Sequence, residues 1–345
     1  MSRVIPRIAI PLFESQTQRL HRAVSHGHLA TGPDLEELEH VLRQRTGRRH
    51  VILVSNGFSA LFVAVKFATM TRGAAVSIPV STCFSIPNAV RANGRTLRFV
   101  DVDPVSMGTP RLSPLPEDAM VVAPDHFGYI SPIIEDCGPL DVPVIHDAAQ
   151  SFLSLTPAHS RGPSVTTLSF YPSKLVNGID GGAILLDNDE LAALMRRFCY
   201  YEDQMAPEVG YRMNLRLPNL HAAFLLGTLE HVAEIRERML VAHKQLLTAA
   251  QQAGLQVTEP RAGTVPTRFI ARASSESERD TLIDLFGQHG INACRELMWL
   301  CDRDNAARFP IAHALQHTTC SLPLHPCLRE EEVHRITRVL LALRH

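Results

Sequence analysis

The stretch Ser169-Phe170-Tyr171-Pro172-Ser173-Lys174 carries one of only three lysines in this chain of 345 residues. It lies downstream of His146-Asp147-Ala148-Ala149-Gln150 and just upstream of Gly181-Gly182. Arginine supplies almost all of the 34 basic residues. Because a lysine can lose its proton when it is buried and a guanidinium cannot, Lys174 marks a position where a removable proton is expected.

Short apolar segments alternate with helical patterns around this stretch. Helical patterns cover residues 34–45, after Pro33, and residues 59–69, directly after the first apolar segment. This alternation predicts an α/β fold with a mainly parallel sheet covered on both faces. The seven predicted strands are residues 51–54, 76–79, 97–100, 120–123, 142–145, 166–170 and 183–186.

The last third of the chain has a different pattern. Residues 218–250 predict one or two long helices, and residues 267–271 a short strand-like segment. Further helices are predicted at 275–289 and 329–343. We therefore expect a large domain over residues 1–230 and a smaller C-terminal α+β domain over residues 231–345.

Asp147 and Lys174 follow two neighbouring predicted strands, where open α/β sheets bind their ligands. An enzyme that uses pyridoxal phosphate (PLP) needs an amine to hold the cofactor as a Schiff base and a carboxylate to keep its pyridine nitrogen protonated. Alone, Asp147 could equally cap a helix and Lys174 could be a solvated surface lysine. Together they favour a PLP site, whereas Lys66 and Lys244 lie in predicted helices and look structural.

The turn around Gly57 predicts a site for the cofactor's phosphate. It leads from the first strand directly into a helix, whose N-terminus attracts anions. The alternative is that Ser59 only caps this helix. The turn has neither a Walker lysine nor a GxGxxG run, which disfavours nucleoside triphosphates and dinucleotides. Ser169 could add a hydroxyl to the same phosphate.

Composition narrows the class of protein. The net charge of −1 gives no reason to expect nucleic acid or a membrane surface as a partner. No stretch approaches the roughly 18 apolar residues of a spanning helix, so we expect a cytoplasmic protein. The seven cysteines form no CxxC pair and are expected as free thiols. Among the 17 histidines, His313 and His317 have ligand-like spacing without a third ligand, so no metal is expected.

With these motifs in hand, the chain resembles the DegT/DnrJ/EryC1/StrS family of PLP-dependent sugar aminotransferases. The likeness includes Asn56-Gly57-Phe58-Ser59-Ala60-Leu61, where the family usually shows Ser-Gly-Thr-Ala-Ala-Leu. It extends through Thr31-Gly32-Pro33, Phe99-Val100-Asp101-Val102-Asp103 and Ser321-Leu322-Pro323-Leu324-His325-Pro326. The resemblance implies fold type I of PLP-dependent transferases.

The resemblance also implies roles for individual residues. Lys174 would form the Schiff base, Asp147 would pair with the pyridine nitrogen, and Gln150 would approach the ring oxygen. Asn214 would reach the phosphate from a neighbouring subunit, so a homodimer with shared active sites is implied. Arg216 would lie near that interface, with a structural salt bridge as its alternative role. The remaining expected site residues are Gly57, Phe58, Ser59 and Ser169 at the phosphate, Cys83 beside the cofactor ring, and Tyr171 on the substrate side.

Two departures from the family concern the cofactor. Phe58 replaces the usual threonine, and Cys83 stands where an aromatic ring commonly stacks on the cofactor. Residues 295–319 show no clear match to the substrate-side pattern. The expected reaction moves an amino group from glutamate or glutamine to a keto sugar, in particular a nucleotide-linked one. The alternatives are a keto-cyclitol or other small ketone as acceptor, a dehydratase of the same fold, and a non-catalytic PLP-binding sensor.

Overall fold

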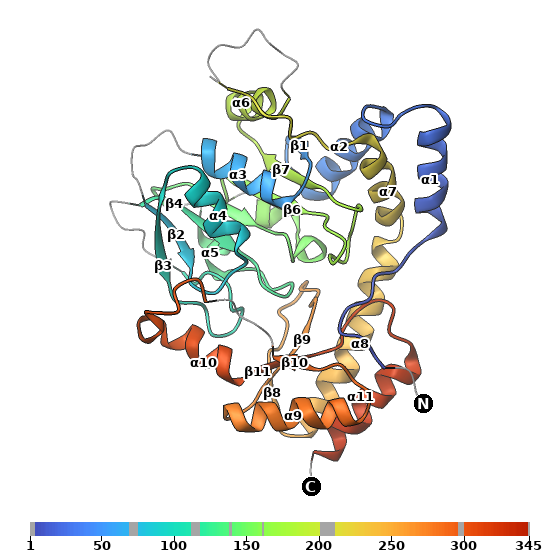
Figure 1. Cartoon of the computed structure of the whole chain (residues 1–345), viewed down its shortest axis with the longest axis vertical. Coiled ribbons are helices and arrows are strands. Elements are labelled where there is room, and N and C mark those ends of the chain that lie inside the picture. Colours follow the sequence, from blue (N-terminus) through green and yellow to red (C-terminus); the bar gives the residue numbers. More distant parts are fainter. Residues whose placement is uncertain are drawn as a thin grey trace.

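The computed structural model describes residues 4–68, 75–111, 118–137, 140–160, 162–200, 211–295 and 300–343. A seven-stranded sheet has the order β1-β7-β6-β5-β4-β2-β3 (Figure 1). Strand β7 is antiparallel to both of its neighbours and all other pairs are parallel. The strands are β1 (His50–Val54), β2 (Ala75–Pro79), β3 (Thr96–Val100), β4 (Asp118–Pro124), β5 (Val144–Asp147), β6 (Val165–Ser169) and β7 (Gly182–Leu186).

All seven predicted strands are confirmed, and one boundary is corrected. The fifth strand begins at Val144 and continues through His146 and Asp147. Both residues extend the parallel ladders, because His146 pairs with Ala123 on one side and Thr166 on the other. Asp147 is therefore the last residue of β5 rather than a residue beyond the strand.

Helices cover both faces of this sheet because its strands are apolar on both sides. On one face, Ile52 and Ile184 pack against α3 (Gly57–Phe67), α4 (Ser85–Ala92) and α6 (Asp189–Cys199). On the other, Leu53 and Leu185 pack against α2 (Pro33–Thr46) and α7 (Asn219–Leu229). Two further helices of this half are α1 (Glu14–Ser25) and α5 (Pro132–Asp136).

The C-terminal part contains a four-stranded antiparallel sheet of order β10-β11-β9-β8. The long helix α8 (Val232–Gln252) runs from the end of α7 towards α9 and α11 (Figure 1). The remaining elements are β8 (Gln256–Val257), β9 (Phe269–Arg272), α9 (Glu276–Gln288), β10 (Cys294–Arg295), α10 (Pro310–Thr318), β11 (Thr319–Leu322) and α11 (Glu330–Ala342). Residues 296–299 of the unmatched segment lie outside the described residues.

One hydrophobic cluster continues from the large sheet into the C-terminal part. It joins Leu42 of α2 and Leu225 of α7 to Leu246 of α8 and Leu340 of α11. The two parts therefore share a core, and the proposed domain boundary after residue 230 stays a prediction. Among the described residues, no helix is both long enough and apolar enough to cross a membrane.

Candidate active site

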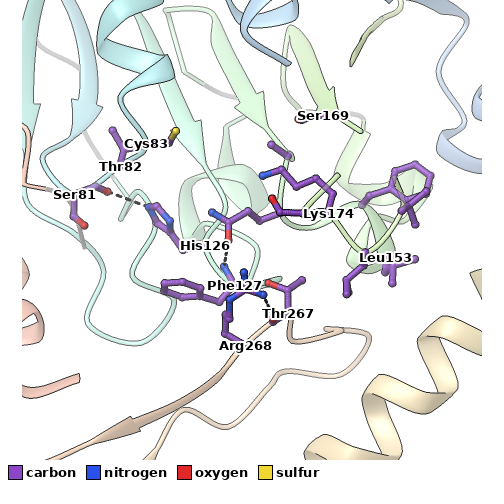
Figure 2. A pocket seen from close by; sticks show the side chains of 16 residues that line it. Ser81, Thr82, Cys83, His126, Phe127, Leu153, Ser169, Lys174, Thr267 and Arg268 are labelled. Atoms are coloured by element: carbon purple, nitrogen blue, oxygen red, sulfur yellow. Dashed lines mark hydrogen bonds between the residues drawn. The ribbon is translucent and has the colours of Figure 1, made fainter. Parts of the chain in front are cut away.

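A cavity of about 230 Å³ opens at the carboxyl edge of the large sheet. Four of the residues expected at the site line it, namely Cys83, Gln150, Ser169 and Lys174. Figure 2 shows Cys83 and His126 along one side, Lys174 and Ser169 on another, and Arg268 entering from the segment that leads into β9. The loops after four strands, β2, β4, β5 and β6, thus meet at one space, as expected for this edge of an open α/β sheet.

Asp147 is a buried carboxylate, with only 7% of its surface exposed. Its Oδ1 accepts a hydrogen bond of 3.1 Å from the backbone N–H of Ala149 and one of 3.4 Å from the Thr167 hydroxyl. Burial raises the pKa of Asp147, and the positive charge of Lys174 opposes this rise. A buried carboxylate of this kind favours a cationic partner, such as the protonated nitrogen of a pyridine ring.

The Lys174 side chain is buried enough that desolvation lowers the pKa of its amine, while Asp147 and Cys83 act in the opposite direction. Lys174 also lines the cavity and is partly buried, so it is not a fully solvated surface lysine. Asp147 and Lys174 lie close enough for each to shift the pKa of the other. A lowered lysine pKa increases the fraction of neutral amine, which is the nucleophilic and basic form.

The phosphate end of the predicted site is a tight junction between α3 and β6. A Cβ placed on Gly57 would lie 2.7 Å from Cβ of Ser169, so only glycine allows the first turn of α3 to lie against that hydroxyl. The cap of α3 is Asn56, whose Oδ1 accepts from Ser59 N at 2.8 Å. The expectation that Ser59 could be the N-cap is corrected, because the helix begins two residues earlier, at Gly57. The Ser59 hydroxyl instead lies 3.0 Å from that of Ser55.

The glycine pair Gly181-Gly182, at the start of β7, lies at the same junction. A Cβ on Gly182 would lie 2.4 Å from the carbonyl oxygen of Asn56. Strands β1 and β7 pair at this point through Val54 and Gly182. The small residue therefore lets the backbone of the helix-leading turn approach β7 closely.

Several predicted residues lie outside the cavity lining of one subunit. The Phe58 ring is 41% exposed, packs on Phe62 with 6.4 Å between centroids, and does not line the cavity. Tyr171 is 55% exposed. Asn214 is exposed as well, and its Oδ1 accepts from Arg216 Nε at 3.4 Å. A single subunit does not bring these side chains to the cavity.

Gln150 is fixed by the loop after β4. Its Oε1 accepts from the backbone N–H of Phe127 at 3.2 Å (Figure 2). That loop also carries His126, a cavity residue that sequence reasoning missed. His126 Nε2 lies 3.0 Å from the carbonyl oxygen of Ser81, so this nitrogen carries the proton. Burial lowers the pKa of His126, which keeps the ring neutral.

A buried polar network behind the cavity was also missed. Asp125 Oδ2 accepts from His146 Nε2 at 2.6 Å and from the Ser151 hydroxyl, while Oδ1 accepts from Ser131 N at 2.7 Å. The side chains of Asp125 and His146 are fully buried. One carboxylate therefore ties together the ends of β4 and β5, the turn that carries Gln150, and the start of α5. Asp125 and His126 follow the predicted strand 120–123, so the rule that selected Asp147 could have selected them.

The site combines a buried carboxylate with a lysine of lowered pKa at the carboxyl edge of a mainly parallel sheet. These are the features of α/β enzymes that bind PLP through a lysine. The sequence profile of the DegT/DnrJ/EryC1/StrS aminotransferase family matches residues 12–114 and 123–341. The chain belongs to this family. It is therefore a PLP-dependent aminotransferase of fold type I.

Relatives agree with this assignment over nearly the whole chain. A UDP-2-acetamido-2-deoxy-3-oxo-D-glucuronate aminotransferase of Pseudomonas aeruginosa is 27% identical over 343 residues, covering 93% of this chain and 94% of the relative. The structure of a DegT DnrJ EryC1 StrS aminotransferase from Brucella abortus matches with a TM-score of 0.84 and 24% identity, covering 96% and 95% of the two chains. NtdA of Bacillus subtilis, solved with bound cofactor PMP, matches with a TM-score of 0.88 and 22% identity, covering 96% of this chain and 81% of that one.

Proposed function

We propose that this enzyme transfers an amino group from glutamate or glutamine to the keto group of a nucleotide-linked sugar. The observation that carries the proposal is the proximity of buried Asp147 to Lys174, a lysine that lines the cavity, in a chain of this family. The relative from Pseudomonas aeruginosa is named for a UDP-linked keto sugar, which supports the same class of acceptor here. All seven cysteines are free thiols, which supports a cytoplasmic location.

PLP supplies an electron sink for the carbon that loses its proton. The residues present fit this cofactor. Asp147 would face its pyridine nitrogen, and the junction of Gly57 with Ser169 would receive its phosphate at the N-terminus of α3. Gln150, fixed through Phe127 N, would orient the ring through its amide.

We assign the proton transfer to Lys174. Among the described residues that line the cavity, its amine is the side chain suited to exchange a proton, because burial lowers the pKa of His126 and makes its imidazole a weak base, and Arg268 cannot lose its proton. Burial lowers the Lys174 pKa, so the amine that takes the α-proton of the donor is neutral more often than an exposed lysine would be.

The homodimer is part of the proposal. Asn214, Tyr171 and Phe58 are exposed in one subunit, although the family resemblance gives them places near the cofactor. A second subunit would bring Asn214 to the phosphate of its neighbour. Mixing a Lys174→Ala variant with an Asn214→Ala variant should then restore activity, because each heterodimer has one intact site. About one quarter of wild-type activity is expected from statistical mixing. Two inactive variants that stay inactive after exchange of subunits would contradict shared sites.

The experiment that tests the proposed reaction follows the visible absorption of the bound cofactor. Adding glutamate to the coloured protein should remove the visible band, and adding an acceptor should restore it. A panel of nucleotide-linked keto sugars, free keto sugars and keto-cyclitols then identifies the acceptor class. An unchanged spectrum with glutamate and glutamine would instead favour the non-catalytic sensor, which the departures at Phe58 and Cys83 motivate.

A further inference from the structure

Two cysteines from distant parts of the chain approach each other at the edge of the cavity. Cys83 follows β2, is exposed, and lines the cavity next to Ser81 and Thr82 (Figure 2). Cys301 lies in the segment before α10 and is partly buried. No local sequence pattern links the two residues, so only the fold brings them together.

Backbone contacts hold the two segments side by side. Ser81 and Leu300 form an antiparallel β-bridge. Cys301 N donates a hydrogen bond of 2.8 Å to the carbonyl oxygen of Val80. The loop after β2 is therefore joined to the C-terminal part of the chain by its backbone. The position of Cys301 beside this loop does not depend on flexible side chains.

The Cys301 side chain points towards the peptide bond that precedes Cys83. Its thiol donates to the carbonyl oxygen of Thr82, with 3.8 Å between sulfur and oxygen. Standard peptide geometry then places Cys301 Sγ within about 7 Å of the Cys83 Cα. Rotation of the two side chains, with a shift of the exposed loop around Cys83, brings the sulfurs to the bonding distance of about 2 Å.

The surroundings of the two thiols differ. Cys83 is exposed, and its thiol has only a long contact of 3.4 Å with the Ser85 hydroxyl, so oxidants in solution can reach it. Burial raises the pKa of Cys301 to about 11, and the nearby Cys83 adds to this rise. Cys301 is therefore protonated at neutral pH and reacts slowly with oxidants. Cys83 is the thiol that is oxidised first.

We propose that Cys83 and Cys301 are a redox modification site and form a reversible disulfide in the PLP-free enzyme. Hydrogen peroxide oxidises the Cys83 thiol to a sulfenic acid and is itself reduced to water. The Cys301 sulfur then attacks the Cys83 sulfur, so that the S–S bond forms and the S–O bond breaks. The hydroxyl group leaves with the Cys301 proton as a second water.

Proximity supports the second step, because a thiol held beside its target reacts as if it were present at high concentration. The disulfide would turn the Cys83 sulfur away from the cavity and towards Cys301. A cofactor bound beside Cys83 should hinder the first step, since it restricts access to the thiol. The modification site does not depend on the proposed transamination.

The test oxidises the full-length, PLP-free protein with an equimolar amount of hydrogen peroxide after complete reduction. The remaining thiols are blocked with iodoacetamide, and the protein is digested without reductant for peptide mass spectrometry. We expect a cross-linked peptide pair that contains Cys83 and Cys301 and separates on addition of dithiothreitol. The oxidised chain should run as a monomer in a denaturing, non-reducing gel. Loading with PLP before oxidation should slow formation of the cross-link.

Two variants and one internal control accompany the wild type. Cys301→Ser should stop the reaction at the Cys83 sulfenic acid, which dimedone traps. Cys327→Ser is the matched control, because Cys327 is also partly buried and does not line the cavity, and it should form the disulfide as the wild type does. Cys294 and Cys320 lie on neighbouring strands with their side chains on opposite faces, because Cys294 pairs with Ser321, so they should not be cross-linked.

The absence of a cross-linked peptide from the oxidised wild type would overturn the proposal. So would pairing of Cys83 with a different cysteine or with a second chain. Equal rates of cross-linking with and without PLP would contradict the protection by the cofactor. Failure of the proposed function has a different signature, because an enzyme whose cofactor spectrum does not respond to glutamate would still form this disulfide.

Discussion

Replacing Asp125 with asparagine should destabilise the turn that carries Gln150 behind the active-site cavity, although Asp125 does not line the cavity. The carboxylate accepts from Ser131 N at 2.7 Å, from His146 Nε2 at 2.6 Å and from the Ser151 hydroxyl. An asparagine of the same size has one acceptor oxygen and turns an NH2 group towards at least one of these donors. The turn between Asp147 and Ser151, which carries Gln150, then loses an anchor.

The magnitude follows from the burial of the pair. Asp125 and His146 have no exposed side-chain surface, so water cannot replace the lost acceptor. Removing one partner of a buried, hydrogen-bonded charged group typically costs about 3 to 5 kcal/mol. Because asparagine keeps one acceptor, we expect a loss of about 3 kcal/mol in the free energy of unfolding. Weaker PLP binding should accompany it, since the turn that holds Asp147 and Gln150 is less well fixed.

Urea unfolding of the PLP-free protein at fixed concentration measures the first effect, and titration of the cofactor's visible absorption measures the second. The matched control is Asp141→Asn, because Asp141 is exposed in a loop. The control should change stability by less than about 0.5 kcal/mol. The double variant Asp125→Asn with His146→Gln should cost less than the sum of the single variants, because the two residues share one interaction. Equal stability losses in Asp125→Asn and Asp141→Asn, with normal PLP binding in both, would refute the reasoning.

Gly57→Ala should weaken PLP binding by about 1 to 3 kcal/mol, because the new Cβ would lie 2.7 Å from Cβ of Ser169. The control Gly287→Ala should leave the cofactor titration unchanged, because a Cβ there would have no atom within 4 Å. Burial lowers the pKa of His243 to about 4, so the unfolded chain binds a proton there that the folded protein does not. Stability should therefore fall by on the order of 3 kcal/mol as the pH drops from about 6.5 to about 4, and pH-dependent unfolding of His243→Met should show a shallower fall. Cys83 is exposed in the cavity wall, so iodoacetamide should label it in the PLP-free protein. Labelling, measured by peptide mass spectrometry, should become slower after PLP is added. Equal labelling rates would argue against a cofactor beside Cys83.

Local sequence patterns were sufficient to predict the strands of the large sheet, because each strand is a short apolar run between helical patterns. The meeting of Asp147 and Lys174 was predictable for a related reason. Carboxyl ends of neighbouring parallel strands share one edge, so chemistry-bearing residues after two such strands converge. The end of β5 was misplaced because His146 and Asp147 are polar, yet the flanking ladders hold them in strand geometry.

The rest of the site depends on contacts between distant segments. Arg268 reaches the cavity because Thr267 is hydrogen-bonded to Phe127, a pairing between residues 140 positions apart that no local pattern encodes. The His126 ring is held in the cavity wall by its hydrogen bond to the carbonyl oxygen of Ser81, which also lies far away in sequence. The cap of α3 was misassigned for a simpler reason. Asparagine and serine are both good N-caps, and the structure uses Asn56, one residue before the glycine.

Reductive trapping tests the central claim most directly, because the chain has only three lysines. The PLP-loaded protein is reduced with borohydride, digested, and searched by mass spectrometry for the peptide that carries the reduced cofactor. We predict the label on the peptide that contains Lys174 and a Lys174→Arg variant that takes up no label. A label on Lys66 or Lys244, or normal labelling of Lys174→Arg, would contradict the account.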